Sequence, residues 1–252
     1  MQRSLLSLML IVGCGLLALP ADADERREPR AVTIAENALE ALGGQAGLDA
    51  TRHIRFNFFG FRTHHWDRQT GDHRLEGQTR DGDTYVVLHN IDSRDGKAWL
   101  NGEAVTGDAL KTQLDQAYGA WINDVYWLMF PFKLLDPGVN LSYSGEEEID
   151  GVTYDIVELS FEKVGLTPGD RYWAWVDRAS GMMARWAFHL ESWEADRERS
   201  VWTWTDWETY GALKLASTRT NLESGRVASI GDIAVFDSLP ASVYTTPDPV
   251  SE

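Results

Sequence analysis

Cysteine is almost absent from this chain. Among its 252 residues there is one cysteine, Cys14, which lies in an apolar stretch near the N-terminus. Disulfide bridges, cysteine-based zinc sites and cysteine nucleophiles are therefore excluded from the rest of the chain. That part must derive its stability from a hydrophobic core.

Basic residues are also scarce. The chain has 23 Lys and Arg against 39 Asp and Glu, a formal net charge of -16, and only five of the basic residues are lysines. Nucleic acids and anionic membrane surfaces are bound by clustered Lys and Arg. No stretch of the sequence is basic, so we expect neither of these as a partner.

Catalytic and cofactor motifs are missing too. The sequence contains no G-x-S-x-G elbow, H-E-x-x-H pair, phosphate-binding loop or dinucleotide-binding glycine pattern. His189 and Glu191 share one face of a predicted strand, but no nucleophile stands near them in the sequence. We therefore predict no catalytic residue and no cofactor.

Two histidines near a predicted hairpin turn raise the question of a metal site. If the strands pair across the turn after Gln69, His64 and His73 lie on one face beside Trp66 and Leu75. No third ligand is evident on that face, and a structural zinc site needs four. We therefore expect no metal.

The first residues have the features of an export signal. Arg3 precedes an apolar run over 5–19, and Ala21-Asp-Ala23 fits a signal-peptidase site, so residues 1–23 are expected to be removed. The run is shorter than the roughly 20 residues that span a bilayer. We expect a periplasmic protein cleaved near Ala23. The alternative is an outer-membrane lipoprotein anchored at Cys14, because residues 11–14 resemble a lipobox.

The remainder, 24–252, is expected to form a single domain. A helix should follow Pro29 and end at Gly43, and from His53 the apolar residues alternate as in a strand. Turn signals then recur at the spacing of an antiparallel meander. We predict a mainly β fold, a large curved antiparallel sheet or incomplete β-barrel of about eleven strands, with two main α-helices closing its open side. A sheet of that size curls into a barrel or splits into two layers.

The second helix is predicted between Thr106 or Asp108, either of which can cap it, and Pro131, which ends it. Apolar residues form a continuous stripe along it, which must face the sheet. Around its C-terminal end the chain is apolar on nearly all sides. This junction is either buried or a lid over an opening, formed by Trp127, Phe130 and Phe132.

Tryptophan is the unusual component, with 11 in the chain. Pairs of rings share strand faces at a spacing of two, and large rings fill the interior of a curved sheet or line a ligand cavity. In the segment 202–211 the alternation breaks, which predicts either a bulge near Thr205 and Asp206 or a strand that leaves the core for solvent. The predicted cavity-lining residues are Phe56, Phe58, Trp173, Trp175, Trp202 and Trp204.

With these elements placed, the chain resembles the LolA/LolB-like periplasmic lipoprotein-carrier superfamily, in a lipoprotein-like exported branch. The resemblance rests on Ala41-Leu-Gly-Gly44, Trp66-Asp-Arg-Gln-Thr-Gly71, Trp121 to Trp127 running into Phe130-Pro131, and the closing segment 236–247. It implies an incomplete, strongly curved barrel closed by helices, with an apolar cavity that takes acyl chains.

The sequence thus leaves three hypotheses for the function. The first is a monomeric, non-enzymatic exported protein that holds a lipid, a lipoprotein acyl chain or another apolar ligand. The second is a structural or interaction module with a filled core that docks onto an envelope protein. The third is an exported hydrolase, which requires histidines and carboxylates that converge in a cleft.

Overall fold

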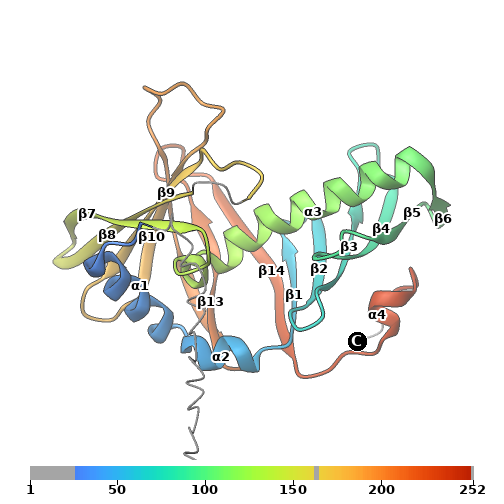
Figure 1. The fold of residues 1–252 in the computed structure, drawn as a ribbon, viewed down its shortest axis with the longest axis horizontal. Helices are drawn as coiled ribbons and strands as arrows, with labels where there is room; N and C mark the ends of the chain where they lie inside the picture. The colour runs from blue at the N-terminus through green and yellow to red at the C-terminus, as the bar shows by residue number, and fades with distance from the viewer. Residues whose placement is uncertain (1–25, 162–164, 251–252) are drawn as a thin grey trace, which may run out of the picture.

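The computed structural model describes residues 26–161 and 165–250. The predicted signal peptide, its cleavage site and Cys14 lie outside these residues. Within them, fourteen strands form two antiparallel sheets (Figure 1). The nine-stranded sheet has the order β12, β13, β14, β1, β2, β3, β4, β5, β6, and the five-stranded sheet the order β11, β10, β9, β8, β7.

The strands have the following bounds: β1 His53–Phe58, β2 Arg62–Asp67, β3 Asp72–Gln78, β4 Thr84–Asn90, β5 Gly96–Leu100, β6 Glu103–Val105, β7 Val139–Ile149, β8 Val152–Phe161, β9 Arg171–Asp177, β10 Met183–His189, β11 Ser200–Thr203, β12 Thr205–Tyr210, β13 Leu213–Thr220 and β14 Val227–Phe236. The predicted fold class is confirmed: mainly β, antiparallel and open. There are more strands than the eleven expected, because turns divide segments such as 96–105 and 200–210 into two strands each.

The first helix, α1 (Pro29–Ala41), packs on the five-stranded sheet through a face of small side chains. Ala31, Ala35 and Ala38 have no exposed surface, which lets the helix approach the sheet closely. The helix ends as predicted, because Gly43 takes a φ of 117°, a left-handed conformation that glycine adopts without strain. A second short helix, α2 (Gly44–Ala50), then leads into β1.

The long helix α3 (Gly107–Met129) lies across the nine-stranded sheet (Figure 1). It begins after Thr106 and passes at its end into a short 3-10 helix, η1 (Phe130–Lys133), that contains Pro131. Both limits agree with the prediction. Among the described residues of the chain, no helix is both long and apolar enough to cross a membrane.

The tryptophan-rich segment 202–211 passes from one sheet to the other. β11 ends at Thr203 in the five-stranded sheet, and β12 begins at Thr205 in the nine-stranded sheet. Asp206 has a φ of 56°, so the chain bends where the alternation of the sequence breaks. The predicted irregularity near Asp206 is therefore present, and it is the hinge between the two sheets.

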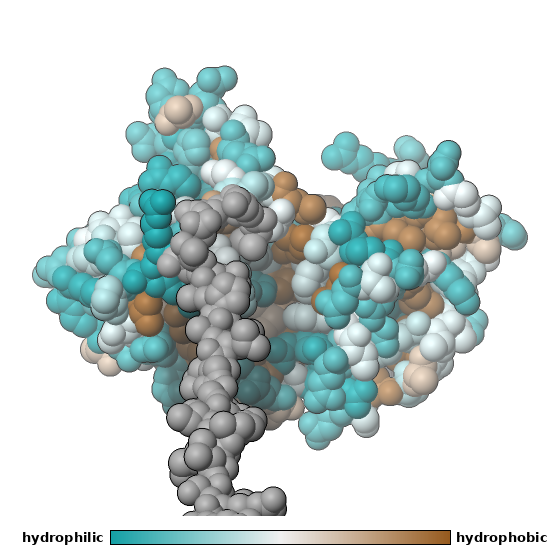
Figure 2. All heavy atoms as spheres, in the orientation of Figure 1, coloured by the Kyte–Doolittle hydropathy of each residue, from teal (hydrophilic) through white to brown (hydrophobic). Residues whose placement is uncertain are grey.

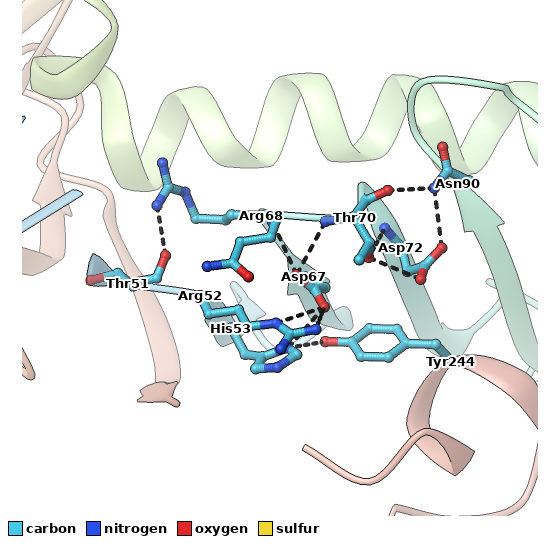
Figure 3. Close-up of polar contacts among 10 residues, drawn as sticks. Thr51, Arg52, His53, Asp67, Arg68, Thr70, Asp72, Asn90 and Tyr244 are labelled. Carbon is cyan, nitrogen blue, oxygen red and sulfur yellow. Dashed lines mark hydrogen bonds and ion pairs between the residues drawn. The ribbon is translucent and has the colours of Figure 1, made fainter. Parts of the chain in front are cut away.

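The turn between β2 and β3 is held by the carboxylate of Asp67 (Figure 3). It accepts hydrogen bonds from the backbone N–H groups of Gln69 and Thr70 at 2.9 and 3.3 Å, and from the Arg52 guanidinium at 2.9 Å. Asp at this turn position binds the backbone as expected. The C-terminal helix α4 (Ser242–Thr245) covers this face, and Tyr244 lies 3.0 Å from the buried ring of His53.

Candidate functional site

An aromatic pocket lies between the second half of α3 and the five-stranded sheet. Its volume is about 580 Å³, within the range of small-molecule sites. In the space-filling view, hydrophobic residues gather in the hollow between the part built on the five-stranded sheet and the part covered by α3 (Figure 2). The aromatic residues that line the pocket are Tyr118, Trp121, Tyr126, Trp127, Phe161, Tyr172, Trp186 and Phe188.

The two walls of the pocket come from different elements. Tyr172 on β9 and Trp186 on β10 stack with their ring centroids 5.8 Å apart, and Phe188 lies 5.4 Å from Trp186. From α3, Trp127 meets Trp186 edge-on at 4.9 Å, and Tyr126 meets Tyr172 at 5.6 Å. Packed rings of this kind hold one another in place, so the walls are preformed.

Polar groups are few among the residues that line the pocket. Lys133 and Asp136 form an ion pair at 2.7 Å, and Asp170 accepts a hydrogen bond from the Tyr172 hydroxyl at 3.2 Å. Burial raises the pKa of Tyr126 and of Tyr172, so both phenols stay neutral and act as hydrogen-bonding groups, not as bases. The pocket is thus suited to binding an apolar molecule.

Only one of the nine predicted ligand-binding residues, Trp127, lines this pocket. Phe130, Trp202 and Trp204 lie in the core cluster that packs against it. The guanidinium of Arg219 stacks on Trp204 at 3.5 Å from the ring centroid and donates to the carbonyl of Trp127 at 2.7 Å. These three rings therefore support the pocket from behind.

Phe56, Phe58 and Phe132 belong to a second cluster, between α3 and the nine-stranded sheet. All three are buried, as is Phe130, so the residues 130–132 plug the end of the sheet. Of the two forms that the sequence left open for this junction, burial is the one observed for Phe130 and Phe132. Trp127 alone is half-buried and contacts both clusters.

Trp173 and Trp175 point to the opposite face of the five-stranded sheet. They form a separate cluster there and donate their indole N–H groups to Glu158 and Glu147 at 3.1 and 2.7 Å. The guanidinium of Arg199 covers both rings, at 5.0 and 4.9 Å. Their placement inside the predicted cavity is corrected: alternation puts Tyr172, not its neighbours, on the pocket side.

The sequence reasoning missed most of the lining. Trp186 and Phe188 alternate along one strand, so their shared face was visible, but nothing showed which side of the sheet α3 covers. Tyr126 lies in the apolar turn at the end of α3, and Phe161 closes β8. These residues meet only because the chain brings α3 beside β9 and β10.

A second site, made of polar side chains, is buried below α3. Asp124 has no exposed surface, and its carboxylate accepts hydrogen bonds from Arg62 at 2.6 and 2.7 Å and from Nε2 of His64 at 2.7 Å. His64 Nδ1 lies 3.0 Å from His73 Nε2, and His73 Nδ1 lies 2.7 Å from His89 Nε2. The predicted hairpin pairing is confirmed, since His64 pairs with Leu75 and Trp66 with His73.

The direction of the hydrogen bonds in this series of side chains follows from Asp124, the carboxylate at one end of it. Asp124 only accepts, so His64 donates through Nε2 and, being neutral, accepts through Nδ1. His73 then donates through Nε2 to His64 and accepts through Nδ1, and His89 donates through Nε2 to His73. Nδ1 of His89 has no partner among the described residues. Burial lowers the pKa of each ring, to about 4 for His89, which keeps all three neutral.

This buried arrangement is closed to solvent at His64 and His73. His64 and His73 are buried beneath α3, where no substrate reaches them. No group of three or more His, Cys, Asp and Glu among residues 26–161 and 165–250 is arranged to hold a metal ion. His189 and Glu191 also point to different partners, the carbonyl of Glu194 and the N–H of Gly169.

No protein-family model and no curated protein matches the sequence. Solved structures that match include a DUF1329 family protein from Desulfovibrio piger, 14% identical, covering 85% of this chain and 96% of that chain with a TM-score of 0.46. A putative outer membrane lipoprotein-sorting protein domain from Vibrio parahaemolyticus is 11% identical, with 85% and 96% covered and a TM-score of 0.43. A LolA superfamily protein from Nitrosomonas europaea is 14% identical, with 86% and 97% covered and a TM-score of 0.39. At this low identity, the chain is similar in structure to proteins described as LolA-superfamily and lipoprotein-sorting-like.

Proposed function

We propose that this chain is an exported, non-enzymatic carrier that holds a lipid or another apolar ligand in the aromatic pocket. The observation that supports this most is the pocket itself: about 580 Å³, walled by eight aromatic side chains and open between α3 and the five-stranded sheet. Each buried CH₂ group of a ligand contributes about 0.8 kcal/mol before ordering costs. An acyl chain therefore gains enough there to leave water.

The proposal includes the setting that the sequence predicts. The protein acts as a monomer in the periplasm, after cleavage near Ala23 or anchored through Cys14, and the acidic surface keeps it dispersed. Its ligand-binding residues are Trp127 and the other rings that line the pocket, with Trp202, Trp204 and Phe130 as support. An envelope protein is the expected recipient or donor of the ligand.

A cavity-filling substitution at Gly119 tests the proposal. Gly119 lies inside α3 and on the pocket lining, and a Cβ there would meet only the Leu166 side chain, at 3.8 Å. Gly119→Phe should place a ring in the pocket and lower uptake of the fluorescent apolar probe N-phenyl-1-naphthylamine at least tenfold. The melting temperature should not fall, because phenylalanine has a higher helix propensity than glycine, although its gain is smaller than the roughly 0.5 to 1 kcal/mol that alanine gives.

Gly119→Ala is the matched control, since it makes the same backbone change but adds a single carbon. It should keep the uptake of the wild-type protein. If the wild-type protein takes up no probe and no lipid is extracted from material purified from bacterial envelopes, the carrier function is wrong. The alternative, an interaction module with a filled core, then becomes the better description.

A further inference from the structure

The pocket contains a buried carboxylate that forms no ion pair with any basic side chain of residues 26–161 and 165–250. Asp170 lines the pocket with 4% of its surface exposed. It accepts hydrogen bonds from the Thr167 hydroxyl at 2.7 Å, the Tyr172 hydroxyl at 3.2 Å and the backbone N–H of Glu191 at 2.8 Å. These donors are all neutral, and Asp170 forms no ion pair within the described part of the chain.

The other charges on the lining do not offset it. Among the described residues of the lining, Lys133 is the one basic side chain, and it is paired with Asp136. These residues contribute two carboxylates and one ammonium group. A negative charge in a site with low-dielectric walls attracts cations and repels anions more strongly than it would in open water.

Three aromatic rings of the lining pack together, and one of them, Tyr172, contacts Asp170 through its hydroxyl. The Tyr172 ring lies 5.6 Å from that of Tyr126 and 5.9 Å from that of Phe161, and Tyr126 and Phe161 lie 6.5 Å apart. Two of these three contacts are edge-on, and all three rings also line the pocket, where the face of an aromatic ring attracts an ammonium group. The rings and the Asp170 carboxylate thus favour one kind of head group.

Building on the proposed carrier function, we propose that the pocket selects amphiphiles with a cationic head, an amine or quaternary ammonium joined to an apolar tail. Asp170 supplies the counter-charge, and Tyr126, Phe161 and Tyr172 supply the aromatic faces. The tail then lies along the apolar wall formed by Trp127, Trp186 and Phe188. Fatty-acid anions are rejected by the same carboxylate.

Asp170 also holds the loop before β9, but that role needs acceptor oxygens and not a charge. Asp170→Asn keeps one acceptor and the shape of the side chain, so it separates the two roles. Asp72 on β3 is a matched control: it also accepts from neutral donors only, the Thr70 hydroxyl at 2.9 Å and the Asn90 amide at 3.1 Å (Figure 3). It lies away from the pocket.

The experiment is displacement of N-phenyl-1-naphthylamine by three amphiphiles with the same tail, each below its micelle concentration: dodecyltrimethylammonium, dodecanol and dodecanoate. In the wild-type protein, the ammonium compound should displace the probe at a concentration about tenfold lower than dodecanol, and dodecanoate should be the weakest. Asp170→Asn should make the ammonium compound and dodecanol equal, whereas Asp72→Asn should keep the tenfold preference.

Each result decides a separate question. If all three amphiphiles bind alike, or if Asp170→Asn keeps the preference, the head-group assignment is wrong while the carrier function stands. If the probe is not taken up at all, the carrier function itself fails. Should Asp170→Asn not fold, Phe161→Leu gives a second test: it keeps apolar volume but loses the ring, and should weaken ammonium binding about threefold while leaving dodecanol unchanged.

Discussion

Replacing Asp124 by alanine is expected to lower the free energy of unfolding by about 3 to 5 kcal/mol. Burial opposes ionisation of Asp124, but hydrogen bonds from His64 and Arg62 outweigh it, and the pKa of the carboxyl lies below its usual range. Removing the carboxylate leaves the Arg62 charge and the first donor of the histidine chain without their acceptor. Since Asp124 joins α3 to β2, the helix should also lose its position above the sheet.

Asp115→Ala is the control for this prediction. Asp115 lies on the same helix and pairs with Lys111 and Arg94, but its side chain is half exposed. An exposed pair contributes little, because water and salt screen it. Urea unfolding of both variants measures the difference. If Asp124→Ala unfolds at the same urea concentration as Asp115→Ala, the buried carboxylate does not hold α3.

The contrast between these two aspartates shows where sequence reasoning ends. Along α3, the apolar stripe and the flanking Thr106 and Pro131 predicted the helix and its limits, because periodicity and caps are local signals. Nothing local separates Asp124 from Asp115. Burial of one depends on Arg62 and His64, which arrive from a strand about sixty residues earlier in the chain.

The strands also show what can and cannot be predicted from a local sequence pattern. For β1, alternation predicted the buried side correctly, with Ile54, Phe56 and Phe58 inside, because Arg55 and Asn57 on its other face stay partly exposed. In β9, four consecutive residues from Trp173 to Val176 are buried, since both faces of the five-stranded sheet are covered. Alternation along such a strand shows which residues share a face of the sheet, but not which element covers that face. The face that lines the pocket was therefore assigned to Trp173 and Trp175, which lie on the other face.

Acidification from pH 7 to pH 4 is expected to destabilise the fold by several kcal/mol. Burial lowers the pKa of His53, His64, His65, His73 and His89, and brings those of His65 and His89 to about 4. In the unfolded chain these rings bind a proton near pH 6.5. Between pH 6.5 and 4 the unfolded state therefore holds more protons than the folded state, and stability falls as the pH falls.

The size of this effect follows from the two values near 4. A difference of about 2.5 pKa units corresponds to roughly 3 kcal/mol for each of His65 and His89, and the other three rings act in the same direction. Domains of this kind are stable by only about 5 to 15 kcal/mol. The buried carboxylates, whose pKa values are lowered, weaken the fold only at pH below about 4, so the two contributions occupy different pH ranges.

Urea unfolding at steps of half a pH unit measures how the free energy of unfolding changes with pH. The variant His89→Gln tests whether His89 contributes to that slope. Glutamine can still donate a hydrogen bond to His73 but binds no proton, so this variant should lose less stability between pH 6.5 and 4, by about 3 kcal/mol. Equal slopes for His89→Gln and wild type would mean that His89 takes up a proton in the folded protein as readily as in the unfolded chain. A protonated His89 still donates through Nε2 to His73, so the hydrogen bonds toward Asp124 would keep their direction, and burial of the ring would not be what holds it neutral.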